Sequence, residues 1–160
     1  MKRVLLSLCL VPLLLAAACT KAPPAPAAAA NPPKHEHKPP HGGTPVVLGA
    51  EVYHLEFVRD AATGQLSAYV FDGELENFIR SSVPAIELVA TVDGAPRSLV
   101  LAAVANPATG ETVGDTSLFA TRADWLESTA NFDAVLKSIT IRGTTFSDVK
   151  FNFPQGNDTD

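Results

Sequence analysis

Hydrophobic and polar residues alternate along much of the stretch 46–154, and this period of two predicts a chain built mainly from short β-strands. The clearest runs are Glu51–Asp60 and Leu66–Asp72, in which apolar side chains recur at every second position. Five residues that include Gly64 separate the two runs. Such a short glycine-containing connection is typical of a β-hairpin, so we expect one over 51–72.

The rest of this stretch follows a similar pattern. Thr121–Asp124 has the spacing of a capping box and predicts a short helix over Trp125 and Leu126, while 132–137 fits either a second helical turn or the start of a strand. The strand spacing predicts a mostly β chain with a single β-sandwich or Ig-like domain over 46–154 and one short helix. The further strands that we expect are Ala85–Val92, Ser98–Ala105, Ser117–Ala120, Ser138–Arg142 and Asp148–Phe153.

The register of the hairpin can be predicted from its two faces. Pairing Leu55 with Phe71 collects the large apolar side chains on one face of the hairpin. The same pairing places His54 opposite Asp72, with Glu56 on their face. A shift by one residue would put Phe71 opposite His54 and mix the faces, so we expect the first register.

The first nineteen residues have the pattern of a secretory signal peptide. Lys2 and Arg3 precede an apolar stretch over 4–15, which is too short to cross a bilayer core of about 30 Å as a helix. Three alanines then precede Cys19, and this resembles the lipobox of bacterial lipoproteins, in which the cysteine carries a lipid after cleavage. Because the next residue is Thr20 and not aspartate, the resemblance implies the outer membrane, facing the periplasm. The alternative is an ordinary signal peptide with a chance cysteine.

Residues 20–45 predict a disordered tether. They are rich in proline and alanine and contain no larger apolar side chain, so they cannot bury enough surface to offset the entropy of ordering. Such a linker favours an extended form that would hold a domain away from a membrane. We also expect the polar residues 155–160 to form a frayed tail.

Charge and cysteine content limit the partners and the kinds of site that the folded part can have. Removing Lys2 and Arg3 from the 12 Lys and Arg leaves 10 against 17 Asp and Glu, so the net charge of the mature chain becomes −7 instead of −5. This acidic balance argues against binding to nucleic acid. Cys9 lies inside the signal peptide and Cys19 would carry the lipid, so the folded part has no disulfide or thiolate site.

The candidate chemistry lies in the histidines, all four of which fall within 35–54. Imidazole and carboxylate are the ligands that zinc and copper use, and three or four must converge on one ion. The alternative is a polar tether that contains histidine by chance, followed by an ordinary strand histidine bonded to an aspartate. The candidate ligands are His35, His37, His41, His54, Glu56 and Asp72.

Three segments are similar to a small β module of bacterial envelope lipoproteins, which occurs beside periplasmic adaptor subunits of heavy-metal efflux systems. They are HGGTPVV at 41–47, YHLE at 53–56 and YVFD at 69–72. The resemblance implies metal handling in the periplasm, and it implies that His41, His54 and Glu56 take part in metal binding. The chain has no long coiled-coil hairpin and no lipoyl-like halves, so it is not a complete adaptor.

Other chemistries find little support in the sequence. No GxSxG elbow or phosphate-binding loop occurs, and His54 is the one histidine within the predicted fold, so we expect no enzyme. Trp125, with Phe119 and Phe132 nearby, fits either a helix that covers the core or an interaction face. The sequence therefore predicts an anchored lipoprotein that binds copper or zinc, with an efflux-adaptor-like protein as a possible partner. Its rival is a structural or interaction lipoprotein without metal.

Overall fold

The structure is a computed structural model that describes residues 38–158 of the chain. The signal peptide with Cys19, most of the predicted tether, and both His35 and His37 lie outside the described residues. The mostly β domain with one short helix that the sequence predicts is confirmed. Eight strands are present in the described part: β1 Thr44–Leu48, β2 Tyr53–Asp60, β3 Gln65–Asp72, β4 Ala85–Val92, β5 Ala95–Ala103, β6 Leu118–Arg122, β7 Phe132–Ile141 and β8 Thr144–Phe153, with helix α1 Trp125–Ser128 between β6 and β7.

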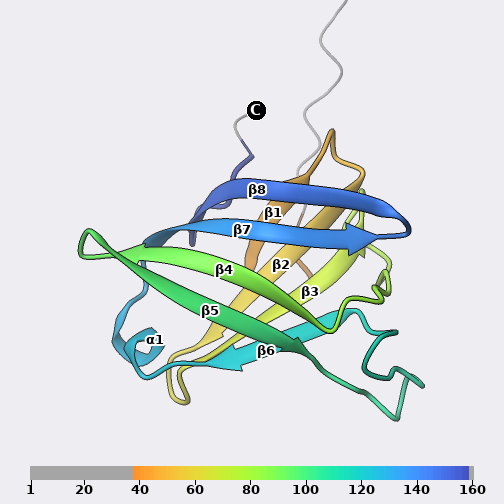
Figure 1. The fold of residues 1–160 in the computed structure, drawn as a ribbon, viewed down its shortest axis with the longest axis horizontal. Helices are drawn as coiled ribbons and strands as arrows, with labels where there is room; N and C mark the ends of the chain where they lie inside the picture. The colour runs from red at the N-terminus through yellow and green to blue at the C-terminus, as the bar shows by residue number, and fades with distance from the viewer. Residues whose placement is uncertain (1–37, 159–160) are drawn as a thin grey trace, which may run out of the picture. The chain divides into compact units, whose positions relative to one another are not determined.

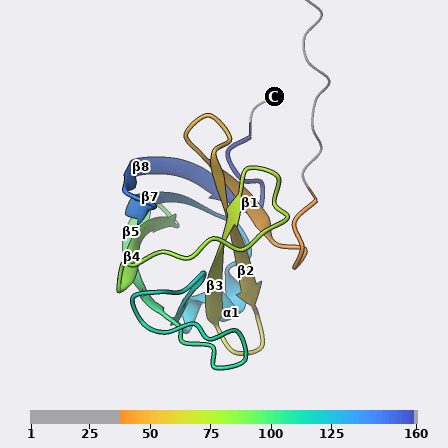
Figure 2. The ribbon, with the colours of Figure 1, turned by 90° about the vertical axis from the view of Figure 1, so that its right-hand side faces the viewer.

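All eight strands belong to one antiparallel sheet in the order β1-β2-β3-β6-β5-β4-β7-β8. The sheet turns over where β5 and β6 pair through only two residue pairs, Ala102 with Ala120 and Ala103 with Phe119. Figures 1 and 2 show the result, with β4, β5, β7 and β8 lying across β1, β2 and β3. The apolar core fills the space between these two parts of the sheet, and Phe57 of β2 stacks on Phe151 of β8 with ring centroids 4.8 Å apart.

Several element boundaries differ from the sequence prediction. Of the two alternatives for 132–137, the strand is confirmed and the helical turn is not, because these residues begin strand β7. The capping box at 121–124 does not form, because Thr121 is still part of β6 and the Asp124 side chain makes no cap hydrogen bond to α1. Trp125 packs against the core and meets the Phe132 ring edge-on at 5.3 Å, as expected for a helix that covers the core.

The predicted hairpin is present, but its predicted register is wrong by one residue. Asp60 pairs with Gln65, not with Leu66, so Phe71 lies opposite His54 and Leu55 opposite Val70. The shift follows from the tighter four-residue turn, which the Asp60 carboxylate stabilises by accepting hydrogen bonds from the backbone of Ala62 at 2.9 Å and the hydroxyl of Thr63 at 2.7 Å.

Polar and apolar residues are mixed on the outer face of the hairpin, and an aromatic cluster that covers this face explains why the mixture is stable. Phe71 is fully buried, yet it does not belong to the cluster of residues that forms the main core. It lies instead in a smaller aromatic cluster on the outside of β2 and β3, where it stacks on Phe78 at 4.6 Å. An apolar residue opposite His54 therefore remains protected from water, and the assumption of a polar outer face fails.

Both ends of the domain differ from the expected tether and tail. Strand β1 begins at Thr44, inside the range 20–45 that the sequence assigns to the tether. Past Pro154 the chain turns back, and Gly156 exchanges two backbone hydrogen bonds with Asn152. The Asn157 side chain then accepts a hydrogen bond from Val47 N at 2.8 Å and donates one to Val47 O at 3.1 Å. Residues 155–157 are thus held against β1, where they satisfy an otherwise unpaired sheet edge.

Candidate functional site

The strongest polar contact on the outer face of β2 joins Glu56 to the segment 41–43. Glu56 follows the core residue Leu55 and points the other way, yet its side chain is 0% exposed because residues 41–43 cross over it. Its Oε1 accepts hydrogen bonds from the backbone N–H groups of His41 and Gly43, both at 2.8 Å. Its Oε2 accepts one from Nδ1 of His41 at 2.7 Å. Three donors thus satisfy a fully buried carboxylate.

The sequence His41-Gly42-Gly43 is suited to this close crossing. Gly42 has a φ of +66°, a left-handed conformation that glycine adopts without strain. Gly43 runs so near to β2 that an added Cβ would lie 2.5 Å from the carbonyl oxygen of Phe57. The two glycines therefore permit the turn and the contact that deliver His41 to Glu56.

The ring of His41 is fixed in position as well as hydrogen-bonded. It stacks on Tyr69 of β3 with centroids 3.9 Å apart and an interplanar angle of 14°, and the rings of Phe71 and Phe78 lie 6.1 and 6.0 Å away. The side chain of His41 stays 33% exposed. Within residues 38–158 no hydrogen bond involves its Nε2. A buried carboxylate that holds Nδ1 leaves Nε2 as the nitrogen available to a ligand.

His54 and Asp72 do not join this pair, contrary to the sequence prediction. His54 is 1% exposed, and its Nδ1 lies 3.3 Å from the backbone oxygen of Asp72 rather than from the carboxylate. In the observed register Asp72 lies opposite Tyr53, and its side chain is therefore on the other parity from His54. The predicted register is wrong by one residue, and for this reason it places the Asp72 side chain on the same face as His54.

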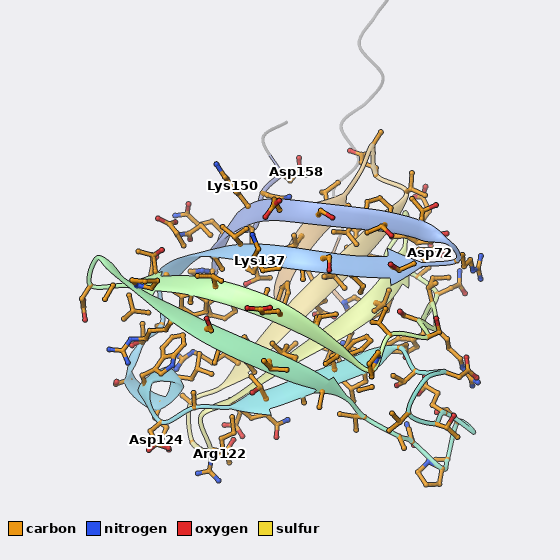
Figure 3. All side chains as sticks on the ribbon, in the orientation of Figure 1. Asp72, Arg122, Asp124, Lys137, Lys150 and Asp158 are labelled. Carbon is orange, nitrogen blue, oxygen red and sulfur yellow. The ribbon has the colours of Figure 1, made fainter. Side chains whose placement is uncertain are left out.

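The carboxylate of Asp72, at the end of β3 in Figure 3, organises the following turn. It accepts hydrogen bonds from the backbone of Glu76 at 3.0 Å and of Asn77 at 3.2 Å, and from the Asn77 amide at 2.7 Å. Burial alone would raise the pKa of Asp72, but these hydrogen bonds outweigh it and hold the pKa below its ordinary value. Asp72 is a turn residue and contributes no ligand to the His41 site.

The predicted set of metal ligands is therefore only partly brought together. Of the four candidates in the described range, the structure joins His41 and Glu56, and it gives His54 and Asp72 other roles. Across residues 38–158 no group of three or more His, Cys, Asp or Glu side chains is arranged to hold a metal ion. His35 and His37 lie outside that range.

A second polar cluster surrounds Glu111, and the sequence pattern does not predict it. Glu111 is buried and accepts hydrogen bonds from the backbone and hydroxyl of Ser117, at 2.8 and 2.6 Å, and from the Thr109 hydroxyl at 2.8 Å. Arg80 lies 3.8 Å from it and also pairs with Asp115 at 2.9 Å. Burial raises the pKa of Glu111, but the hydrogen bonds and the Arg80 charge outweigh it and lower the pKa. No alternation marks these loop residues, because two separate segments supply them, one between β3 and β4 and one between β5 and β6.

Between this cluster and the aromatic rings lies a pocket of about 260 Å³. Its aromatic side is formed by Tyr69 and Phe78, and its polar side by Arg80, Asn106 and Glu111 among others. The segments between β3 and β4 and between β5 and β6, which carry most of these residues, lie on the same side of the domain (Figure 2). Tyr69 connects the two features, since one of its faces is covered by His41.

Within the described part of the chain, no helix has the length and apolar character needed to span a membrane. No protein-family model matches the chain, and comparisons with curated proteins and with solved structures gave no match either.

Proposed function

We propose that this chain is an envelope-anchored lipoprotein that binds copper or zinc, with His41 as the ordered ligand. The observation that carries the proposal is the hydrogen bond from Nδ1 of His41 to the buried Glu56, together with the exposure of the ring. Metal-binding histidines commonly donate their second ring nitrogen to a carboxylate, which fixes the ring and raises its basicity. Glu56 would thus orient the ligand without touching the ion.

The remaining ligands would come from the residues just before His41. His35 and His37 precede it by six and four positions, close enough in sequence to reach one ion with it. Three imidazoles are a donor set that suits copper and zinc. His54 and Asp72 are left out of this set because of the contacts described above.

The location rests on the sequence. The signal-peptide pattern of 1–19 and the lipobox-like end at Cys19 support a lipid anchor in the outer membrane, facing the periplasm. The proposal is of binding rather than catalysis, with metal efflux or homeostasis as the process and an adaptor-like envelope protein as a partner. The resemblance at 41–47, 53–56 and 69–72 supports this link.

The rival function, a structural or interaction lipoprotein without metal, is favoured by one specific observation. Two of the three hydrogen bonds to Glu56 come from backbone N–H groups, and these attach segment 41–43 to the domain whether or not a metal binds. Under this hypothesis the ring of His41 would serve only as a further contact of that attachment.

A metal titration separates the two functions. The mature chain, residues 19–160 with Cys19→Ser, is titrated with Cu²⁺ and with Zn²⁺ at pH 7 by calorimetry, beside His41→Ala and His35→Ala/His37→Ala. A Lys34→Ala/Lys38→Ala variant is the matched control, because it changes the same segment without removing an imidazole. We expect one-to-one binding that weakens at least tenfold in both histidine variants and is unchanged in the control. Binding that is absent, or equal in all variants, would leave the rival function.

A further inference from the structure

The pocket beside the His41 ring has a composition that metal binding does not explain. Phe78 forms part of its wall, and although the ring covers Phe71, the side chain is 54% exposed, so more than half of a large aromatic surface stays in contact with water. The ring is nevertheless fixed, since it stacks on the buried Phe71 at 4.6 Å, and the next residue, Ile79, is buried. An exposed aromatic ring that is held rigidly is suited to contact with a ligand.

The polar side of the pocket is equally preorganised. Arg80 is held by Asp115, which lies outside the pocket, at 2.9 Å and by the carbonyl oxygen of Thr109, which also lines it, at 2.6 Å. Asn106 is held by its Oδ1, which accepts a hydrogen bond from Ala108 N at 3.1 Å. Donors remain available: among residues 38–158, Nδ2 of Asn106 makes no hydrogen bond, and Nε of Arg80 has only the ion pair with Oε1 of Glu111 at 3.8 Å, beyond hydrogen-bond distance. Both carboxylate oxygens of Glu111, by contrast, already accept hydrogen bonds.

Charge and size limit what the pocket can take. Arg80 lies between Glu111 and Asp115, so the local charge is negative and disfavours an anion such as phosphate. The pocket of about 260 Å³ is at the small end for ligand sites and has room for a single ring-sized unit. The free groups are donors, so the ligand must offer acceptor oxygens on one side and an apolar face to Phe78 and Tyr69 on the other.

We propose that this pocket binds one neutral pyranose residue of a glycan. A pyranose ring has an apolar C–H face that packs on an aromatic ring, and a rim of hydroxyl or acetamido oxygens that accept hydrogen bonds from Asn106 and Arg80. The proposal does not depend on metal binding, because none of the residues that form the pocket is a proposed metal ligand. An aromatic side chain of a protein partner would use Phe78 but would leave the donors of Asn106 and Arg80 unpaired.

The test is an NMR titration of the mature chain, residues 19–160 with Cys19→Ser and without added metal. Diacetylchitobiose and cellobiose are added to millimolar concentrations, and backbone amide shifts are followed in this chain, in Phe78→Ala and in Val100→Ala. Val100 is the matched control, since it is 60% exposed and lies on β5, outside the pocket.

We expect saturable shifts at 78–80 and 106–111 with at least one sugar, weakened at least tenfold by Phe78→Ala and unchanged by Val100→Ala. Far-UV circular dichroism of each variant verifies that the β domain remains folded. Absence of saturable shifts with both sugars, or equal shifts in Phe78→Ala, would overturn the proposal. Shifts produced at these residues by an aromatic peptide and not by either sugar would also overturn it, in favour of a protein partner.

Discussion

Replacing Glu56 by alanine tests whether one buried carboxylate holds segment 41–43 on the domain. The substitution removes three hydrogen bonds of 2.7–2.8 Å from a side chain that is 0% exposed. It also removes an ionisable group from a fully buried site, so part of the loss is compensated by the smaller desolvation cost. The segment itself can detach and recover hydrogen bonds with water.

The expected magnitude follows from these opposing terms. Hydrogen bonds to charged groups contribute roughly 1.5–3 kcal/mol each, and three of them set an upper bound that detachment and desolvation reduce. We therefore expect Glu56→Ala to lower the free energy of unfolding by about 3 kcal/mol. For a domain of this size that corresponds to a fall in Tm on the order of 10 °C.

Urea unfolding followed by far-UV circular dichroism gives the free energy, and hydrogen exchange reports on the segment. The amide protons of His41 and Gly43 should exchange much faster in Glu56→Ala, while those of β4 should keep their relative protection. Glu87→Ala is the control, since Glu87 is an exposed glutamate in β4. A loss below about 1 kcal/mol, or unchanged exchange at His41 and Gly43, would show that Glu56 does not hold the segment on the domain.

Gly43→Ala should lower the free energy of unfolding by at least about 2 kcal/mol in urea melts, because its Cβ would meet the Phe57 carbonyl at 2.5 Å; a neutral result would contradict the close crossing. Asn157→Ala should cost about 1–2 kcal/mol and speed exchange at Val47, whereas Gln155→Ala, in the same tail, should do neither. Finally, folding lowers the pKa of Glu111 and of Asp72 from their ordinary values of 4.5 and 3.8. The ionised carboxylates therefore stabilise the domain at pH values above these ordinary values, and this stabilisation is lost as pH falls through the lowered pKa values of the folded state. The urea midpoint of unfolding should therefore fall between pH 7 and pH 3, and it should fall less steeply in Glu111→Gln. An equal fall in both proteins would show that Glu111 does not contribute to the pH dependence of stability.

The strands were the predictable part of this fold. Strand β4 buries one face only, so alternation alone locates it at Ala85–Val92 with both ends correct. The hairpin register was missed because it depends on a second layer of contacts, the cluster of Phe71 and Phe78, that covers an outer face which the pattern assigned to solvent. Periodicity along one strand carries no information about what crosses over it.

The candidate site was predictable only where a local feature of the chain, the glycine pair 42–43, brings its residues together. His41 and Glu56 were both proposed, and the two glycines between them indicated the turn that joins them. The prediction of Asp72 as a ligand beside His54 is wrong because the predicted register is wrong, since a shift by one residue moves a side chain to the other face. The pocket near Glu111 could not be predicted, because its residues come from segments between different strands and meet only in the folded chain.

In the proposed site, Glu56 orients His41 so that Nε2 binds the metal ion. Long-range ¹H–¹⁵N NMR of the imidazole groups, with Zn²⁺ added to the mature chain, is the decisive experiment because each ring nitrogen is observed separately. We expect the Nε2 signal of His41 to move to the metal-bound range while Nδ1 stays protonated, and the signals of the buried His54 to stay unchanged. Unchanged His41 nitrogens at saturating zinc, or a response at His54 instead, would show that His41 is not the ordered metal ligand.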